Sequence, residues 1–275
     1  MLKISKKVIN KYLVPNLSQG KRGPNCKVGL WRIVRAIIKR LKTGLQWREL
    51  PIKSLFGRHQ ISWKTVYYYF SKWTKDGSWY RMWTELLKVN KRSLDMSSIQ
   101  IDGSHTPCKR GGEQVAYQGR KKCKTSNMLF LTDKKGIVLA CSDPISGNHN
   151  DLFEIKKNVS KIFNTLTDSG ISCKGLFLNA DAGFDSKKLR MFCSNLGVIP
   201  NFCKNKRNTK DLDMEDYPFD SHLYKERFVV ERTNAWIDGF KNLIIRYETK
   251  ALHWISLHYL AFAIIFLRKL NLLQS

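Results

Sequence analysis

The sequence predicts an α/β protein in which a mixed sheet flanked by helices follows a small all-helical region. In residues 1–95 the apolar positions recur every three or four residues, the period of helices that pack one face against a core. From residue 96 onward, short alternating or wholly apolar runs take turns with helical stretches, which is typical of a sheet covered by helices. We therefore expect two domains, over residues 1–95 and 96–275.

Two strongly patterned helices stand out in the first region. The stretch "GLWRIVRAIIKRLKTG" has one apolar face and one basic face, and Gly44 is its expected end. In "ISWKTVYYYFSKWTKDG" we expect a helix with Ser62 as its N-cap. Its inner face should consist of Val66, Phe70 and Trp73. Its outer face should consist of Lys64, Tyr67, Tyr68, Ser71 and Lys75. Short basic helices joined by tight turns are typical of a helix-turn-helix DNA-binding region, and a plain basic helical bundle is the alternative.

The second region alternates between strands and helices. The expected elements, in order, are the strand "SIQID", a hairpin turning at Asp133–Gly136, the helix "NDLFEIKKNVSKIFNTL", the strand "GLFLNADAG", the helix "SKKLRMFCSNLG", the strand "VIPNFCKN", a loop over residues 204–217, the helix "LYKERFVVERTNAWIDGF" and the apolar last helix "HWISLHYLAFAIIFLRKLNLL". On the helix before the last, we expect Val229, Thr233, Trp236, Phe240 and Leu243 to face the core and Tyr224, Arg227, Glu231, Asn234 and Asp238 to face away.

The charge and the cysteine content indicate which class of partner the protein binds and in which cellular compartment it is found. The 49 Lys and Arg residues against 22 Asp and Glu residues give a net charge of +27, which attracts polyanions such as nucleic acid. The seven cysteines form no C-x-x-C pair, so we expect reduced thiols in the cytoplasm. The charged N-terminus predicts no signal peptide, and the apolar run Tyr259–Leu267 is too short to span a bilayer, so we expect no membrane partner.

Two acids follow buried strands. Asp102 ends "SIQID", where Gly103 should break the strand, and Asp181 ends the apolar run of "GLFLNAD". If the two strands are parallel neighbours, these carboxylates meet in the crevice at the strands' carboxyl ends, and a divalent cation such as Mg²⁺ or Mn²⁺ relieves their repulsion. With Glu231 from the following helix, three acids could hold two metals about 4 Å apart, the geometry for displacement at phosphorus. Taken singly, Asp102 and Asp181 could be turn residues and Glu231 a partner of Arg227.

The blocks that carry these acids resemble a known family. "IQIDGS", "LNADAGFDS" and "YKERFVVERTNAWIDGF" resemble the three signature blocks of the IS5/IS4-type DDE transposases of bacterial insertion sequences. "SGNHND" is similar to a G-N-x-x-D stretch common in that group, and "GLQWRELP" and "TVYYYFSKW" are similar to its DNA-binding region. The resemblance spans nearly the whole chain.

This resemblance implies an RNase H-like catalytic core in which Asp102, Asp181 and Glu231 are the metal ligands, with two Mg²⁺ or Mn²⁺ ions expected. It implies hydrolysis at the element's terminal inverted repeats, transfer of the 3′-hydroxyl into target DNA, and a homodimer on DNA. Tyr224 and Arg227 match the Tyr-Arg-Glu-Lys signature of the wider IS4 group and would reach towards phosphate. Residue 238 is Asp where that pattern has Lys, and Lys241 is only a weak substitute for the DNA-contacting lysine.

Other candidates are less specific. The basic segment 108–124, with Lys121 and Lys122, could grip the DNA backbone or be a solvated hairpin tip. Asp151 could approach the site or cap a helix, Asp185 with Ser186 should cap the following helix, and the imidazoles of the last helix (His253 and His258) should lie at the edge of the core. Two rival functions remain: a catalytically inactive, transposase-derived DNA-binding protein, and a stand-alone RNase H-like nuclease.

Overall fold

Two compact units make up the chain in the computed structural model, which describes residues 4–20, 26, 28–59, 61–205 and 218–273. The first unit comprises Met1–Val89, Lys109–Glu113 and Trp236–Ser275, and the second comprises Asn90–Cys108 and Gln114–Ala235. The C-terminal helices therefore belong to the first unit, although the sequence places them after the α/β strands. Most of the predicted loop 204–217 lies outside the described residues.

The first unit is helical. Its helices are α1 (Lys6–Val8), α2 (Leu30–Thr43), α3 (Ile52–Phe56), α4 (Trp63–Lys75), α5 (Ser78–Asn90), α10 (Lys241–Ile244) and α11 (Ala251–Lys269). Short helical turns at Ile9–Leu13, Val14–Asn16 and Trp47–Glu49 connect them. Helix α11 is long and apolar enough to cross a membrane by length and composition, but 83% of its most apolar stretch is buried within the protein. The predicted buried last helix is confirmed.

Helix α2 follows the predicted pattern closely. Ile33, Val34, Ile37 and other apolar residues of its inner face are buried. The helix ends at Gly44, whose φ of 72° is readily adopted only by glycine and whose N–H donates to the Arg40 carbonyl at 2.8 Å. The expected helix and its expected end are both confirmed.

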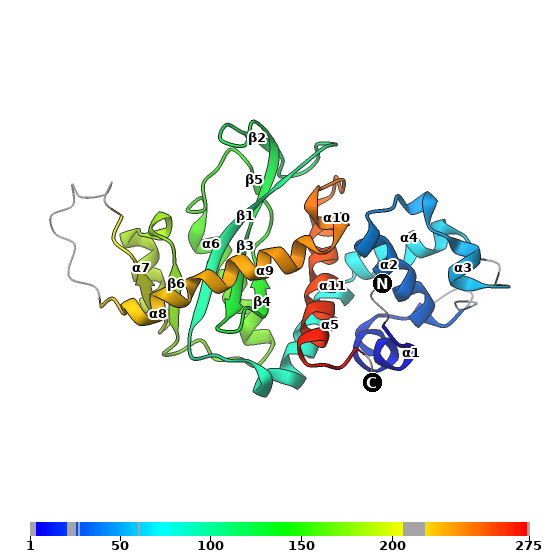
Figure 1. Cartoon of the computed structure of the whole chain (residues 1–275), viewed down its shortest axis with the longest axis horizontal. Helices are drawn as coiled ribbons and strands as arrows, with labels where there is room; N and C mark the ends of the chain where they lie inside the picture. Colours follow the sequence, from blue (N-terminus) through cyan, green and yellow to red (C-terminus); the bar gives the residue numbers. More distant parts are fainter. Residues whose placement is uncertain (1–3, 21–25, 27, 60, 206–217, 274–275) are drawn as a thin grey trace. The chain divides into compact units, whose positions relative to one another are not determined.

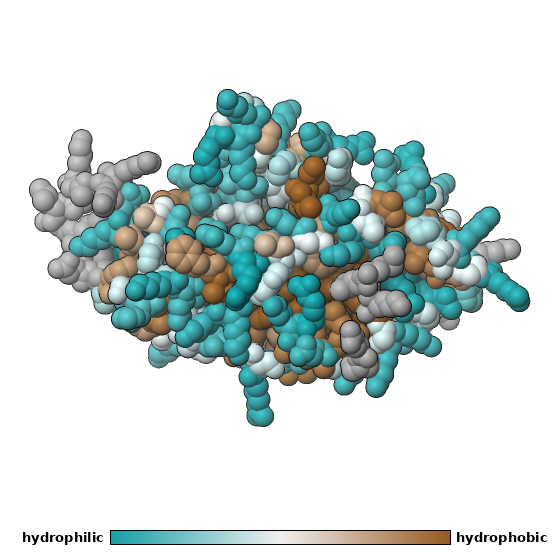
Figure 2. All heavy atoms as spheres, in the orientation of Figure 1, coloured by the Kyte–Doolittle hydropathy of each residue, from teal (hydrophilic) through white to brown (hydrophobic). Residues whose placement is uncertain are grey.

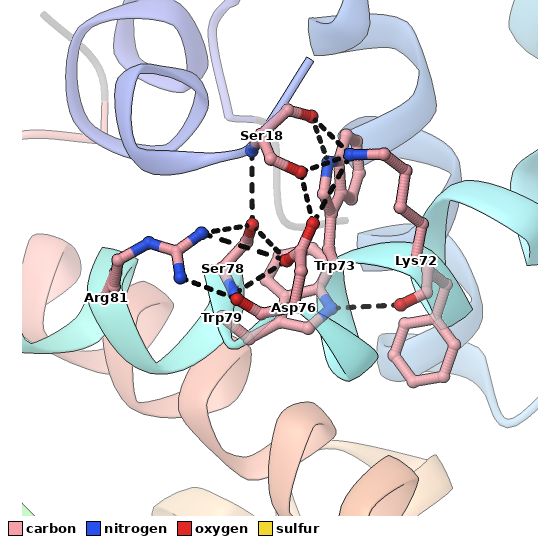
Figure 3. A network of polar contacts seen from close by, with 8 residues as sticks. Ser18, Lys72, Trp73, Asp76, Ser78, Trp79 and Arg81 are labelled. Carbon is pink, nitrogen blue, oxygen red and sulfur yellow. Dashed lines mark hydrogen bonds and ion pairs between the residues drawn. The ribbon is translucent and has the colours of Figure 1, made fainter. Parts of the chain in front are cut away.

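A polar network fixes the junction between α4 and α5 (Figure 3). The carboxylate of Asp76 accepts from the Ser78 N–H at 3.0 Å and from the Ser18 hydroxyl, while Lys72 pairs with it across one helical turn at 3.3 Å. The Trp73 indole N–H donates to the Ser18 carbonyl at 2.9 Å. This network connects the segment before α2 to α4 and so fixes the position of α4 within the first unit.

The second unit is built on a seven-stranded mixed sheet (Figure 1). Its strands are β1 (Ile99–Pro107), β2 (Ala116–Gln118), β3 (Cys123–Asp133), β4 (Val138–Cys141), β5 (Ile145–Ser146), β6 (Phe177–Ala180) and β7 (Ile199–Phe202). Its helices are α6 (Ile155–Asp168), α7 (Lys187–Asn195), α8 (Ser221–Lys225) and most of α9 (Val229–Asp238). The order β2-β3-β1-β6-β7, with β4 and β5 also on β3, makes β1 antiparallel to β3 and parallel to β6. The predicted α/β fold with a mixed sheet is confirmed.

The predicted break at Gly103 is wrong. Strand β1 runs on to Pro107 because it pairs with β3 along its whole length, from Ile99 opposite Asp133 to Pro107 opposite Thr125. Gly103 lies inside this strand with an ordinary extended backbone. It serves instead to let a neighbouring side chain approach, since a Cβ there would lie 2.0 Å from an oxygen of Asp151.

The turns and caps of the second unit agree with the sequence at most points. The β3–β4 hairpin turns at Asp133–Gly136 as predicted, and Ser186 caps α7 by accepting from the Leu189 N–H. Asp185 instead forms a buried ion pair with Arg190 at 2.7 Å. Helix α6 begins only at Ile155, so Asp151 is not its N-cap.

The predicted helix of residues 223–240 is divided. Helix α8 ends at Lys225, a 3-10 turn covers Glu226–Phe228, and α9 follows. This turn shifts the helical phase, so that Val230, Thr233 and Ile237 are the most deeply buried positions of α9. Of the predicted inner residues, Thr233, Phe240 and Leu243 are buried, whereas Val229 and Trp236 are half-buried and Lys269 lies 3.6 Å from the centre of the Trp236 ring.

Acid should destabilise the first unit through His258. This imidazole is buried in α11, with Nδ1 hydrogen-bonded to the Trp254 carbonyl at 3.0 Å, and burial lowers its pKa to about 4. In the unfolded chain this imidazole therefore binds a proton near pH 6.5, whereas in the folded chain it stays neutral until the pH approaches 4. The contribution to stability is complete above about pH 6.5 and falls by on the order of 1 kcal/mol per pH unit as the pH drops towards 4.

Urea unfolding between pH 4 and 7 measures this dependence. The His258→Gln variant should show a flatter profile than the parent, and His222→Gln, which changes an exposed imidazole, should not. Equal slopes for the parent and His258→Gln would contradict the assignment.

Candidate active site

The candidate site is organised by the parallel pairing of β1 with β6. Ile99 lies opposite Leu178 and Gln100 opposite Asn179. Continuing this register by two residues places Asp102 level with Asp181, which directly follows β6. Asp181 therefore follows the carboxyl end of β6, whereas Asp102 lies inside β1, just beyond the residues that pair with β6.

Asp102 lies in a half-buried position among other charges. Burial and, after it, the charges of Asp151 and Asp181 raise the pKa of its carboxyl, which comes to about 6. The Gly103 N–H, which donates to the carboxylate, and the charge of Arg227 act in the opposite direction. Asp102 is thus a carboxylate that gains from a cation, because the surrounding protein compensates its negative charge only in part.

Asp181 is held by the turn that follows β6. Its side chain accepts from the Gly183 N–H at 2.8 Å, so it caps the short 3-10 turn Ala182–Phe184. The predicted role as a strand-ending residue is present, but one carboxylate oxygen still carries further acceptor capacity. The cap fixes the orientation of this acid beside Asp102.

Helix α8 and the start of α9 lie on the sheet face to which Asp102 belongs. Gln100 and Asn179 share this face with Asp102, and the Asn179 amide donates to the Leu223 carbonyl at 2.9 Å. Further along, the Thr233 hydroxyl donates to the Gly136 carbonyl at 2.7 Å in the β3–β4 turn. The helical segment therefore runs across the sheet from β6 to the β3–β4 turn (Figure 1).

Arg227 and Tyr224 bring a positive group to the two acids. The guanidinium lies 5.5 Å from the centre of the Tyr224 ring and acts on the charge of Asp102. Burial raises the pKa of Tyr224, and the nearby Arg227 opposes this shift. The Nε of Arg227 is buried without a hydrogen-bond partner. A guanidinium next to the acids partly compensates their negative charge.

Glu231 lies one turn beyond Arg227, on the exposed side of α9. The salt bridges found among the described residues do not include one between Glu231 and Arg227, so the alternative of a helix-surface ion pair receives no support. In the described part of the chain, no three His, Cys, Asp or Glu side chains are close enough together to hold a metal ion. Asp181 thus acts on the charge of Asp102, and Glu231 does not complete a metal-holding group with these two acids.

A third acid that the sequence analysis did not assign to the site lies beside this pair. Asp151 fills the space next to Gly103 and accepts from the Asn127 amide. The available signal was the "SGNHND" stretch. Asp151 was equally suited to begin a helix, and only the tertiary structure separates the two interpretations.

The donor set suits a hard divalent cation. Asp102, Asp181 and Asp151 offer oxygen ligands only, and oxygen ligands are those that Mg²⁺ and Mn²⁺ prefer. The half-buried Asp102, whose charge is only partly compensated, is consistent with a cation at this edge of the sheet.

The predicted DNA-contacting residues of the first unit are placed on α4 and α10. Lys64 and Tyr68 are exposed, and 60% of the Tyr68 surface is open to solvent. Tyr67 does not face outward, because its ring packs 5.2 Å from Trp47 and 6.0 Å from His253. Lys241 is exposed at the start of α10 and lies beside Gly44: a Cβ atom added to Gly44 would be 3.4 Å from the Cβ of Lys241.

The part of the basic segment from Gln114 onward belongs to the second unit. Strand β2 pairs with the start of β3, and both Lys121 and Lys122 are exposed in the connection between them. Lys121 donates to the His105 carbonyl at 2.8 Å, so its ammonium lies along the outer part of β1. In the view of Figure 2, hydrophilic residues cover much of the visible face, as expected for so basic a chain.

Comparison with known families identifies the class. Residues 101–265 match the model described as "DDE superfamily endonuclease", and residues 7–83 match one described as "Putative transposase of IS4/5 family". The chain therefore belongs to the DDE superfamily endonucleases. The resemblance to IS4/5-type transposases is confirmed, and so is the mixed sheet, through the antiparallel pairing of β1 with β3 and its parallel pairing with β6.

Individual relatives and solved structures match this chain over a short stretch or at low sequence identity. The chain is 36% identical over 72 residues to the Burkholderia cepacia protein "Putative transposase for insertion sequence element IS402"; the match covers 26% of this chain and 29% of that relative's length. A piggyBac transposase synaptic complex with hairpin DNA aligns with a TM-score of 0.46 and 8% identity, over 98% of this chain and 74% of that one. A pre-cleavage Mos1 transpososome aligns with a TM-score of 0.30 and 11% identity, over 90% and 80%.

Proposed function

We propose that this protein is a DNA transposase that cuts phosphodiester bonds at the ends of an insertion sequence and joins the freed 3′-hydroxyl to target DNA. The observation that supports the proposal is the parallel register of β1 and β6, whose continuation brings Asp102 level with Asp181, in a chain that belongs to the DDE superfamily endonucleases. Asp102, Asp181 and Glu231 are the proposed catalytic acids and metal ligands.

Each proposed site residue has a distinct task. Asp102 and Asp181 provide the acidic edge of the sheet, and Glu231 would join them from α9. Arg227, whose guanidinium lies beside the Tyr224 ring, would bind a non-bridging phosphate oxygen and so hold the phosphodiester in front of the acids. Bound Mg²⁺ or Mn²⁺, two ions in this proposal, would stabilise the charge that develops on the phosphate and activate the attacking hydroxyl.

The reaction needs no external energy source. Water first attacks the phosphorus at a transposon end, the phosphodiester bond breaks, and a 3′-hydroxyl is released. That hydroxyl then attacks a phosphodiester of the target strand, so that one P–O bond forms as another breaks. Because equivalent bonds are exchanged, ATP hydrolysis is not required.

DNA contacts are proposed on both units. Lys64 and Tyr68 of α4 are suited to the terminal inverted repeats, with Tyr67 supporting the helix from its packed side. Lys121, Lys122 and Lys241 would contact the DNA backbone. The net charge of +27 favours these contacts in general. Because two ends must be joined, we propose a homodimer on DNA, acting in the cytoplasm.

Replacing Asp181 with Asn should abolish catalysis and leave DNA binding intact. Asn keeps the cap on the Gly183 N–H but removes the charge, so Mg²⁺-dependent cleavage at the repeat ends should fall about a hundredfold or more. The assay uses labelled DNA carrying the element's inverted repeats, with binding followed by gel shift. Asp143→Asn, which neutralises an acid paired with Lys161, is the matched control and should cleave normally.

Other outcomes separate the rival functions. Binding without cleavage by the parent protein would identify an inactive DNA-binding relative, and cleavage that ignores the repeats would identify a stand-alone nuclease. Full activity in Asp181→Asn would overturn the proposed site.

Removing the charge at Lys64 should weaken repeat binding through loss of a phosphate contact. We expect Lys64→Ala to reduce the slope of log affinity against log salt by about 1. Fluorescence anisotropy across a salt series provides the measurement. Lys88→Ala, on the surface of α5 and 3.6 Å from Glu85, is the control. Identical salt slopes for Lys64→Ala and the parent would remove α4 from the proposed interface.

A further inference from the structure

Glu226 begins the 3-10 turn that carries Arg227. The turn covers Glu226–Phe228 and lies between α8 and α9, so the backbone position of Arg227 depends on how this turn is fixed. The helices before and after it are attached to the sheet through the Leu223 carbonyl and the Thr233 hydroxyl. The turn between these two points is attached to the sheet by the side chain of Glu226.

The carboxylate of Glu226 contacts the sheet through both of its oxygens. The Ser98 hydroxyl donates to Oε2 at 2.8 Å, and the Lys134 ammonium lies 2.9 Å from Oε1. Ser98 directly precedes β1 and is fully buried, whereas 39% of the Lys134 side-chain surface is exposed. Because solvent screens an exposed ion pair, the hydrogen bond from the buried Ser98 is the contact that fixes the turn.

Ser98 belongs to a buried polar chain on the face of β1 that carries Asp102. The Gln100 amide donates to the Ser98 hydroxyl at 2.8 Å, and the Thr132 hydroxyl of β3 donates to Gln100 Oε1 at 3.3 Å. Side chains alternate between the two faces of a strand, so Ser98, Gln100 and Asp102 share one face. The hydrogen bond from Ser98 therefore connects the 3-10 turn to the strand that holds Asp102.

Arg227 is the group that this connection places. Its guanidinium lies 5.5 Å from the centre of the Tyr224 ring and 5.1 Å from that of the Phe228 ring, and its charge acts on the carboxylate of Asp102. Because Arg227 directly follows Glu226, a displacement of the turn would move the guanidinium relative to Asp102. A misplacement of about 1 Å in a group that positions substrate can slow a reaction by about a hundredfold.

We propose that Glu226 is a positioning residue, which holds Arg227 beside Asp102 through the hydrogen bond from Ser98. This inference rests on the proposed function, in which Arg227 would bind a non-bridging oxygen of the phosphodiester that is cut. Loss of Glu226 then slows the cleavage step and leaves the affinity for DNA unchanged, because the basic residues that contact the DNA backbone are still present.

Single-turnover cleavage of labelled DNA carrying the element's inverted repeats, at saturating protein, tests the proposal. Glu226→Ala should lower the cleavage rate constant about tenfold or more, while the dissociation constant for the same DNA without Mg²⁺ changes by less than about threefold. Ser98→Ala, which removes the other partner of the bond, should show the same separation of rate from affinity. Glu226→Gln keeps an oxygen that accepts from Ser98 and should retain most of the cleavage rate.

Two control variants separate the hydrogen bond from the charge. Lys134→Met removes only the exposed ion pair with Glu226 and should cleave at the parental rate. Glu85→Ala removes an equivalent acid, 3.6 Å from Lys88 on the surface of α5, and should also cleave at the parental rate.

A double-mutant cycle shows whether Glu226 acts through Arg227. Arg227→Ala should slow cleavage, and Glu226→Ala added to it should cause no further loss, because the group that Glu226 places is gone. The melting temperature of each variant is measured, and Ser98→Ala replaces Glu226→Ala in the cycle if the latter is poorly folded. A second readout needs no cleavage: the NMR signal of the Arg227 Nε–H should shift in Ser98→Ala and stay unchanged in Glu85→Ala.

The outcomes distinguish this inference from the proposed function. Parental cleavage by Glu226→Ala and Ser98→Ala, or a loss that multiplies fully with that of Arg227→Ala, would overturn the positioning role and leave the proposed function standing. Cleavage by Glu226→Gln as slow as that by Glu226→Ala would overturn the role of the Ser98 hydrogen bond. Absence of Mg²⁺-dependent cleavage by the parent protein would overturn the proposed function itself.

Discussion

The candidate chemistry depends on one structural constraint, the parallel alignment of β1 with β6. Only two residue pairs, Ile99 with Leu178 and Gln100 with Asn179, define it. A shift of one residue would turn the side chains of either strand to the opposite face and separate Asp102 from Asp181. The buried polar groups of this sheet face hold the alignment, since Gln100 accepts from Thr132 and Asn179 is bound by both Asn201 and the Leu223 carbonyl.

Acids that lie close together at this edge repel one another, and neighbouring donors and a positive group reduce this repulsion. Asp102 receives the Gly103 N–H and the field of Arg227, Asp181 receives the Gly183 N–H, and Asp151 receives the Asn127 amide. Each acid thus has one donor, which leaves further oxygen lone pairs available for a cation. The positive group comes from the α8–α9 segment, which the Leu223 and Thr233 contacts hold on the sheet. One helical segment thus carries the positive group that acts on Asp102.

Much of this arrangement could be predicted from the sequence, because local signals and tertiary requirements coincide. Buried strands ending in Asp102 and Asp181 predicted the acidic edge, and the Asp133–Gly136 turn and the stop at Gly44 were evident from turn chemistry. Other features depend on contacts between distant residues. Gly103 suggested a strand end because the approach of Asp151 is invisible along the chain. The 3-10 turn at Glu226–Phe228 changed which residues of α9 are buried. Tyr67, which was predicted to contact DNA from the outer face of its helix, packs on Trp47 instead. The burial of α11 was evident from its apolar sequence, but its assignment to the first unit was not.

The most direct test of the account is the position of Mn²⁺ in crystals of the protein, located by anomalous diffraction. The account predicts an anomalous peak at about 2 Å from carboxylate oxygens of both Asp102 and Asp181. Well-ordered crystals soaked in Mn²⁺ that show no peak between these two side chains, or show peaks only at other acids, would contradict it.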